Sequence, residues 1–272
     1  MIRIDSLDDE RIQPYRNLKD RELAAMGGLF LAEGEHVTRR LMASRTHQTH
    51  SVLLAEHRVE SIAPAVPLGV PIYVGSREMV SQIVGYTFHS GVLSVGIRPA
   101  NPSLESIFEN EPAGGRTTLL ICPEVINHDN LGSLIRIAAG FGVSAMLVGE
   151  RSCDPYWRRS VRVSMGTIFS LPVITSRHLS SDLELLQKKW GVHTIATVLD
   201  AEAIPLQRSL RKQMPNGGRR IGILLGSESQ GLDRWTIDHC DTKVTIPMFH
   251  GTDSLNIAVA AGVFLYHYTC QD

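Results

Sequence analysis

Residues 117–142 read TTLLICPEVINHDNLGSLIRIAAGFG, and this stretch decides the fold class. Residues 117–122 are β-branched or apolar, as in a fully buried strand. A polar loop follows, in which Asp129 or Asn130 is expected to cap a helix. The core face of that helix is marked by apolar residues at helical spacing, namely Leu134, Ile137, Ala138 and Phe141. A buried strand followed by an amphipathic helix is the repeating unit of a parallel α/β sheet.

The same strand and helix unit recurs downstream of this stretch. Runs rich in β-branched residues, separated by segments of helix length, lie at 144–148, 171–175, 192–198, 220–225 and 243–247. This alternation predicts a parallel sheet with helices on both faces. Residues 254–269 are apolar on nearly all sides, so we expect a last helix that is buried within the protein or against a second subunit.

Upstream, residues 1–98 predict a separate small α/β domain. Helical patterns at 15–26, 34–44 and 76–84 alternate with β-rich runs at 51–55, 71–74 and 91–97. Residues 99–116 concentrate proline, glycine and acidic residues with little apolar periodicity, which indicates a linker. The expected domains are therefore 1–98 and 117–272, joined by 99–116.

The composition excludes several classes of protein. The chain has 272 residues, 43% of them hydrophobic and 20% charged, which rules out disordered, collagenous and coiled-coil proteins. With 27 Lys and Arg against 28 Asp and Glu, the net charge of −1 gives no global basic field. Any contact with nucleic acid must therefore be local.

Cysteine usage and apolar patterning indicate the compartment. The 4 cysteines are far apart and form no CxxC pair, so neither a zinc site of ordinary spacing nor a disulfide framework is expected. The N-terminus lacks the apolar region of a signal peptide, and no run reaches the ~18 apolar residues that span a bilayer. We expect a soluble protein of the reducing cytoplasm, without a metal ion.

A glycine-rich turn follows one of the predicted strands. Gly226-Ser-Glu-Ser-Gln-Gly231 has the spacing of a phosphate loop, but Leu232-Asp233 replaces the lysine and hydroxyl residue that hold phosphate and magnesium. Glu228 disfavours polyphosphate and occupies the serine position of a nucleophile elbow, which argues against a hydrolase that uses Ser227 or Ser254. On local grounds, a tight connection without function and a ligand site are both open.

Arg136 and the segment before the last helix each allow a structural and a functional interpretation. Arg136 either points toward the strand ends, where open α/β sheets bind ligands, or is a solvated helix residue. Asp253 or Ser254 is an ordinary helix cap, which leaves Asn256 unexplained. His250 with Asp253 is weak evidence for a metal site or an acid/base pair.

One local stretch is both basic and aromatic. Within residues 151–162, Tyr156 and Trp157 lie among arginines, a pattern typical of surfaces that bind phosphates and stack on bases. The arginines are Arg151, Arg158, Arg159 and Arg162. A solvated helix face explains the same pattern, so both interpretations are open.

Three of these segments occur together and in order, each where a strand passes into a loop. They are Asn130-Leu-Gly-Ser-Leu-Ile-Arg-Ile-Ala138, Ile223-Leu-Leu-Gly-Ser-Glu-Ser-Gln-Gly-Leu232, and Ile246-Pro-Met through Ser254-Leu-Asn-Ile-Ala-Val-Ala260. Weaker matches are Phe30-Leu-Ala-Glu-Gly34 and Ser164-Met-Gly-Thr167. With this combination the chain resembles the SpoU-type, or TrmH-like, RNA 2′-O-ribose methyltransferases of the SPOUT superfamily.

The resemblance implies a parallel α/β domain whose C-terminal segment is threaded into a trefoil knot, in homodimers packed through that domain. The loops of the knot hold S-adenosylmethionine as the methyl donor, gripped largely by backbone groups. The matching positions here are Leu225, Gly226, Ile246, Met248, Ser254 and Leu255, with Thr197 in a loop that closes the same site.

The resemblance also implies the reaction, in which a ribose 2′-hydroxyl attacks the sulfonium methyl group. Arg136 matches the catalytic arginine of the family. Its polar companions are Asn130, Glu228, Ser254 and Asn256. Because an arginine pKa above ~12 leaves almost no neutral form, we expect Arg136 to bind the neighbouring phosphate and stabilise the developing alkoxide rather than act as the base. A catalytically silent RNA-binding protein on the same scaffold is the alternative.

The resemblance extends to the substrate. Residues 1–98 are similar to the small RNA-binding domain that many family members carry, through 30–34 and 89–93. The implied partner is structured rRNA or tRNA, held in part by the arginines of 151–162. The chain departs from the family at Phe249-His250-Gly251, where the second residue after the methionine is often glycine.

Overall fold

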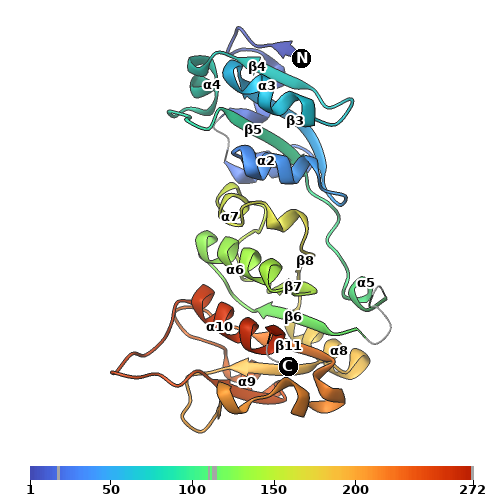
Figure 1. The fold of residues 1–272 in the computed structure, drawn as a ribbon, viewed down its shortest axis with the longest axis vertical. Coiled ribbons are helices and arrows are strands. Elements are labelled where there is room, and N and C mark those ends of the chain that lie inside the picture. Colours follow the sequence, from blue (N-terminus) through green and yellow to red (C-terminus); the bar gives the residue numbers. More distant parts are fainter. Residues whose placement is uncertain (17–18, 110, 112–114, 271–272) are drawn as a thin grey trace. The chain divides into compact units, whose positions relative to one another are not determined.

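The protein is described here by a computed structural model (Figure 1). The residues that the structure describes are 1–16, 19–109, 111 and 115–270. By its internal contacts the chain divides into two units. Unit 1 combines Met1–Ala100 with Asp154–Ser170, and unit 2 combines Asn101–Cys153 with Leu171–Asp272. No helix within the described ranges is long and apolar enough to cross a membrane.

Unit 2 is built on a seven-stranded sheet in the order β10-β12-β9-β11-β6-β7-β8, and each neighbouring pair is parallel. The strands are β6 (Thr117–Cys122), β7 (Ala145–Val148), β8 (Val173–Thr175), β9 (His193–Thr197), β10 (Ile204–Pro205), β11 (Arg220–Leu224) and β12 (Thr242–Thr245). The predicted parallel α/β sheet is therefore confirmed. The short edge strand β10 was not predicted, because two residues give no readable alternation.

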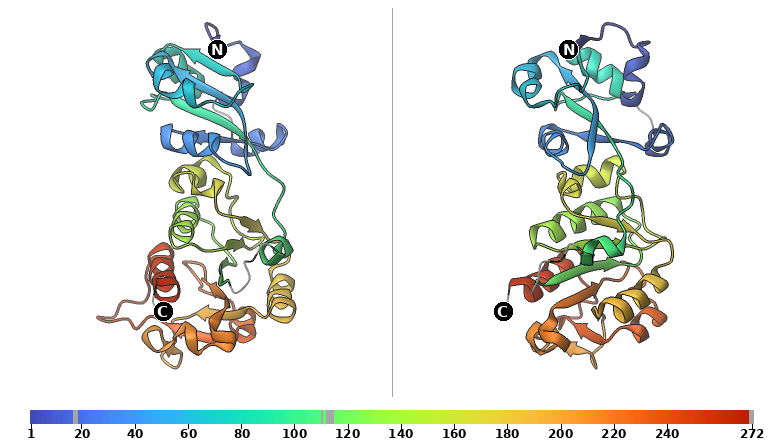
Figure 2. Two further views of the ribbon diagram at one scale, coloured as in Figure 1. Left: turned by 45° about the vertical axis from the view of Figure 1, so that its right-hand side comes forward. Right: turned by 90° about the vertical axis from the view of Figure 1, so that its right-hand side faces the viewer.

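Helices lie on both faces of this sheet (Figure 2). They are α5 (Leu104–Glu109), α6 (His128–Gly140), α8 (Leu179–Trp190), α9 (Arg234–His239) and α10 (Ile257–Cys270). Helices α6 and α10 pack against each other on one face, whereas α5 and α8 lie on the opposite face (Figure 2). The core on the α5 and α8 side joins their apolar residues to those of β6, β7 and β11.

Part of the expected linker, residues 99–116, is an ordered element of unit 2. Leu104 and Phe108 of α5 are buried in the core, and the Phe108 ring stacks on Trp190 with 4.7 Å between ring centroids. The helix was not predicted because it is a single short segment among proline, glycine and acidic residues. Residues 110 and 112–114 of the expected linker lie outside the described residues.

The last helix is α10, and it is buried on one face only within this chain. Ala261 and Leu265 are fully buried. Val259, Val263 and Tyr266 expose 54%, 39% and 54% of their surface. The expected burial on all sides is therefore not reached within one copy of the chain, and an apolar face remains exposed.

Unit 1 is a small α/β unit with a mixed five-stranded sheet in the order β1-β4-β3-β5-β2. Its strands are β1 (Ile2–Arg3), β2 (Leu29–Glu33), β3 (Gln48–Ala55), β4 (Ile72–Gly75) and β5 (Val92–Ile97). Strand β5 is antiparallel to β2 and β3, and the other pairs are parallel. Its helices from the N-terminal segment are α1 (Asp20–Ala25), α2 (Glu35–Met42), α3 (Val59–Ile62) and α4 (Arg77–Val84).

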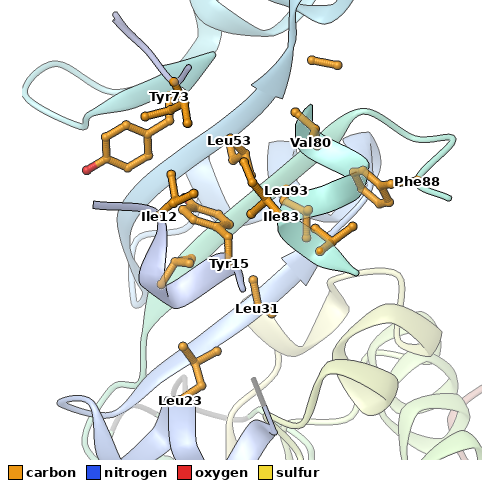
Figure 3. Close-up of a cluster of buried hydrophobic side chains, with 14 of the residues drawn as sticks. Ile12, Tyr15, Leu23, Leu31, Leu53, Tyr73, Val80, Ile83, Phe88 and Leu93 are labelled. Atoms are coloured by element: carbon orange, nitrogen blue, oxygen red, sulfur yellow. The ribbon is translucent and has the colours of Figure 1, made fainter. Parts of the chain in front are cut away.

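The core of unit 1 gathers apolar side chains from both ends of the N-terminal segment (Figure 3). Ile12 and Tyr15 of a short 3₁₀ helix pack with Leu53 of β3, Leu93 of β5 and Ile83 of α4. The helix predicted over 15–26 is therefore divided: the 3₁₀ helix ends at Tyr15 and α1 begins at Asp20. Residues 17 and 18 lie outside the described residues.

Residues 154–170 pack with the N-terminal segment, although the sequence placed them in 117–272. This segment carries α7 (Arg158–Val163). The Tyr156 hydroxyl lies 2.8 Å from His47 Nε2, and the rings of Phe169 and Phe30 lie 5.6 Å apart. These aromatic contacts could not be predicted from the sequence, because the two residues of each contact lie more than a hundred positions apart.

Candidate active site

A cavity of about 590 Å³ lies at the carboxyl ends of three neighbouring strands of unit 2. Its lining includes Thr197 at the end of β9, Leu225 directly after β11 and Ile246 directly after β12. Open parallel sheets bind ligands at this edge, because the loops that leave adjacent strands meet there. The volume is within the range of about 300–1,000 Å³ that small-molecule sites occupy.

The cavity brings together every position that the sequence matched to the methyl donor. These are Thr197, Leu225, Gly226, Ile246, Met248, Ser254 and Leu255, and all of them line the cavity. They lie at or after the carboxyl ends of β9, β11 and β12, and the loops that leave these strands meet at the cavity. Their contact with the donor itself stays a prediction.

The loop after β11 is closed too tightly to carry a residue larger than glycine at position 226. Ser227 and Gly231 exchange two backbone hydrogen bonds of 3.0 Å, and Gly231 has a φ of +68°. A Cβ atom on Gly226 would lie 2.2 Å from the carbonyl carbon of Gly231. The two glycines of this motif therefore serve close backbone approach and a left-handed turn rather than a phosphate loop.

A chain of amide hydrogen bonds joins the three motifs. Asn256 Nδ2 donates to Asn130 Oδ1 at 3.1 Å, and Asn130 Nδ2 donates to the Glu228 carboxylate. Asn130 lies on α6, Glu228 lies in the loop after β11, and Asn256 directly precedes α10. Both ends of the Asn130 amide are engaged, so its orientation is fixed by its two partners.

The residues that cap α6 and α10 differ from those expected. This difference explains why the Asn130 side chain can take part in the hydrogen bonds with Glu228 and Asn256. Asn127, rather than Asp129 or Asn130, caps α6, because its Oδ1 accepts from Asp129 N at 2.8 Å. The side chain of Asn130 is thereby left for Glu228 and Asn256. Asn256 itself, rather than Asp253 or Ser254, caps α10: its Oδ1 accepts from Ala258 N at 2.9 Å.

Arg136 lies on α6, one and a half turns beyond Asn130. Its side chain is exposed and does not line the cavity. Within the part of the chain that the structure describes, its guanidinium has no hydrogen-bond or ion-pair partner. Of the two interpretations that the sequence left open, the exposure of Arg136 fits the solvated helix residue, and the group is available to bind an anion.

The ionisable groups of the cavity favour a cationic ligand. Arg234 and Lys243 line it but both pair with Asp238, at 2.7 and 3.3 Å. The hydrogen bond from Arg234, with that from Lys243, lowers the pKa of Asp238. The carboxylates Asp200, Glu228 and Asp253 also line the cavity. In the described ranges no group of three or more metal-ligating side chains was found.

The predicted RNA-binding arginines are divided between the two units. Arg151 belongs to unit 2 and pairs with Glu124 at 3.1 Å. In unit 1, Arg158 Nε lies 2.8 Å from Glu33, and Arg162 lies 3.4 Å from the same carboxylate. Arg159 is exposed. Glu33 therefore offsets one of these positive charges, and Glu124 offsets another.

Several residues of the cavity were not predicted from the sequence. Ile257, Ala260 and Phe264 of α10, with Ile237 of α9, contribute apolar surface to it. The three residues of α10 were expected only as part of a buried apolar helix, because an apolar helix residue has the same appearance whether it faces a core or a cavity. Predicting that these residues line the cavity would have required knowing how α10 packs against α6.

Comparisons with known proteins agree with this arrangement. The model of the SpoU rRNA methylase family matches residues 117–266. An uncharacterized tRNA/rRNA methyltransferase of Mycobacterium tuberculosis is 33% identical over 268 residues, which cover 96% of this chain and 89% of that protein. The 23S rRNA (guanosine(2553)-2′-O)-methyltransferase RlmP of Bacillus subtilis is 26% identical over 98% of this chain and 99% of its own length.

The fold also matches solved structures. The AdoMet-bound rRNA methyltransferase from Sinorhizobium meliloti superimposes with a TM-score of 0.79 at 23% identity, over 97% of this chain and 96% of that chain. At this identity the likeness concerns the fold, and the family model and the relatives carry the assignment. The resemblance found in the three motifs is thus confirmed: the chain belongs to the SpoU rRNA methylase family.

Proposed function

We propose that this protein transfers a methyl group from S-adenosylmethionine to the 2′-hydroxyl of a ribose in rRNA or tRNA. The main observation behind the proposal is that the three sequence motifs lie together at the carboxyl ends of the strands of unit 2. The second and third motifs line one cavity at the strand ends. Asn130 of the first motif is joined to them by its hydrogen bonds with Glu228 and Asn256. The family model and the names of the relatives support the same reaction.

The cavity suits the methyl donor in shape and charge. Leu225, Ile246 and Met248 offer apolar surface for a flat base, and Gly226 leaves the main chain bare for hydrogen bonds. The carboxylates of the lining favour a ligand that carries positive charge. When bound, S-adenosylmethionine supplies a methyl group already activated by its sulfonium sulfur. The chain then needs to orient the acceptor and to manage one proton.

Arg136 is the proposed group for the acceptor side. Its guanidinium stays protonated, so it binds the phosphate next to the target ribose and stabilises the developing alkoxide. The fixed amide of Asn130, together with Glu228, Ser254 and Asn256, orients the ribose or the arginine. The absence of a partner for Arg136 within the described residues supports this role.

RNA recognition is assigned to unit 1 and to the basic stretch. We propose that residues 1–98 bind structured RNA, and that 117–272 contain the catalytic site, except that residues 154–170 belong with unit 1. Arg151, Arg159 and Arg162 are the preferred phosphate contacts of the basic stretch. Arg158 acts mainly through its ion pair with Glu33. The reaction is expected to take place in the cytoplasm.

A second copy of the chain is the proposed partner of α10. The exposed apolar residues Val259, Val263 and Tyr266 support a homodimer through unit 2, since such a face is covered in stable proteins. We further propose that the segment from β12 to α10 is threaded as the trefoil knot of the family. Its return from β12 to pack α10 against α6 supports that path.

The test is a transfer assay with the intact protein. The protein is incubated with tritiated S-adenosylmethionine and total RNA from a strain that lacks its gene, and label in RNA is counted. RNA from the parent strain, already methylated, is the matched control and should take up little label. Saturable donor binding without transfer to either RNA would favour the silent RNA-binding alternative.

A further inference from the structure

The loop between β12 and α10 contains a tight turn beside the cavity. Thr252 N donates to Phe249 O at 3.1 Å, and the central residues His250 and Gly251 have φ values of 57° and 70°. Positive φ at both central positions is the signature of a type I′ turn. Met248 and Asp253, which flank the turn, both line the cavity, so the turn lies at its rim.

His250 occupies a position that glycine would fill without strain. Only three residues other than glycine have positive φ in the described part of the chain, and His250 is one of them. Side chains are disfavoured in this conformation, and such strain concentrates at functional sites. The resemblance implies that glycine is often found at this position, so His250 is a departure from the family pattern.

Phe249 is presented to solvent by this turn. It exposes 74% of its surface, and residues 249–256 are all exposed. The loop stands out from the rest of unit 2 in two views (Figures 1 and 2). The side chains of Phe249 and His250 have no hydrogen-bond, ion-pair or ring partner among the described residues. A large flat apolar ring in this setting has no role in the folding of the chain.

We propose that Phe249 stacks on a base of the RNA substrate and that His250 hydrogen-bonds to the same nucleotide, next to the methyl-donor cavity. The inference rests on the proposed function and adds the residues that hold the nucleotide. Proteins that recognise RNA by sequence bind mainly single-stranded loops, whose unstacked bases stack on exposed aromatic side chains. Phe249 is one residue from Met248 of the lining, so a stacked base lies close to the donor.

The surroundings of Phe249 favour RNA over a second protein chain. Its neighbours in the turn, His250, Gly251, Thr252 and Asp253, are polar or small and exposed. A stable protein interface needs a contiguous apolar centre. The apolar face that meets this need is on α10, at Val259, Val263 and Tyr266. A single exposed ring among polar groups is instead typical of a base-stacking platform.

The test measures the apparent KM for RNA with tritiated S-adenosylmethionine and total RNA from a strain that lacks the gene. Phe249→Ala and Phe249→Leu should raise this KM about 5- to 100-fold, the effect of losing one stacked base. Phe249→Trp should keep it within about threefold, because indole stacks equally well. His250→Gly preserves the turn and should raise KM less, with an unchanged or higher Tm. Leu185→Ala on α8, which also removes an exposed apolar side chain, should leave KM unchanged.

Donor affinity and molecular mass, measured on the same variants, separate the alternatives. The Kd for S-adenosylmethionine and the mass in solution should match those of the unaltered protein. An unchanged KM in Phe249→Ala, an equal loss in Phe249→Trp, or a halved mass would overturn the inference, the last by assigning the ring to a protein interface. Absence of transfer by the unaltered protein would overturn the proposed function itself, which is a distinguishable result.

Discussion

The two sides of the candidate site are built by different means. On the proposed donor side, Leu225, Gly226, Ile246 and Met248 line the cavity with small or apolar residues. The proposed substrate side consists of Asn130, Arg136, Glu228, Asn256 and Phe249, whose side chains are polar or exposed. The donor side should therefore be sensitive to added volume, and the substrate side to the identity of each side chain.

The largest expected effect is at Arg136, on the substrate side. Arg136→Ala should lower kcat about 100- to 1,000-fold, the usual effect of removing one group that stabilises a developing oxyanion. The Kd for S-adenosylmethionine, measured by calorimetry, should stay within about twofold, because Arg136 does not line the cavity. Arg136→Lys should remain strongly impaired, since lysine cannot form the bidentate contact. Near-normal transfer by that variant would contradict this role.

Added volume at Gly226 should act on the donor side alone. Gly226→Ala places a Cβ atom 2.2 Å from backbone, so the loop must shift and donor affinity should fall roughly 10- to 100-fold. Gly140→Ala at the end of α6 is the matched control, because a Cβ there meets nothing within 4 Å. Calorimetric titration with S-adenosylmethionine measures both. If Gly226→Ala and Gly140→Ala bound S-adenosylmethionine with equal affinity, the donor side would not be sensitive to added volume as we expect.

A charge exchange tests the amide chain. Asn130→Asp should lower kcat about tenfold, because it sets a second carboxylate against Glu228. Combining Asn130→Asp with Glu228→Gln restores a hydrogen bond in the opposite direction, so kcat should largely recover. Steady-state kinetics of the two single variants and the double variant measure whether kcat recovers. If the double variant is no better than the worse single one, the charge of Glu228 acts on the substrate directly.

The smallest expected effect concerns pH and involves His47 of unit 1. Burial lowers the pKa of His47 from 6.5 to about 4. Between these values the unfolded chain binds a proton that the folded chain does not, so the free energy of unfolding falls on acidification, by roughly 1–2 kcal/mol after screening. His47→Gln should flatten this dependence. Urea unfolding at pH 7.5 and 4.5 measures it, and an equal pH dependence in both proteins would exclude His47.

Much of unit 2 could be predicted because parallel strands have a strong local pattern. β6, β7, β9 and β11 each contain uninterrupted β-branched or apolar runs, which only a strand buried on both faces accommodates. The donor positions came from the resemblance of the motifs to the family, and all of them line the cavity. The helix caps did not, because Asn127 and Asn256 compete with equally suitable neighbours for the same backbone groups.

What the sequence could not show depends on contacts between distant segments. The packing of 154–170 with the N-terminal segment rests on Glu33, Phe30 and His47, which are far away along the chain. The pairing of Glu33 with Arg158 also converts a predicted phosphate contact into a structural ion pair. No local pattern carries this information, since an arginine on a short helix has the same appearance in either role.

The most direct test of the central claim is to identify the atom that receives the methyl group. RNA labelled in the transfer assay is digested to nucleosides and analysed by mass spectrometry, which separates methylation of the ribose from methylation of the base. We predict one labelled nucleoside with the methyl group on the ribose 2′-oxygen, absent with Arg136→Ala. Label on a base, or none despite saturable binding of S-adenosylmethionine, would contradict the account.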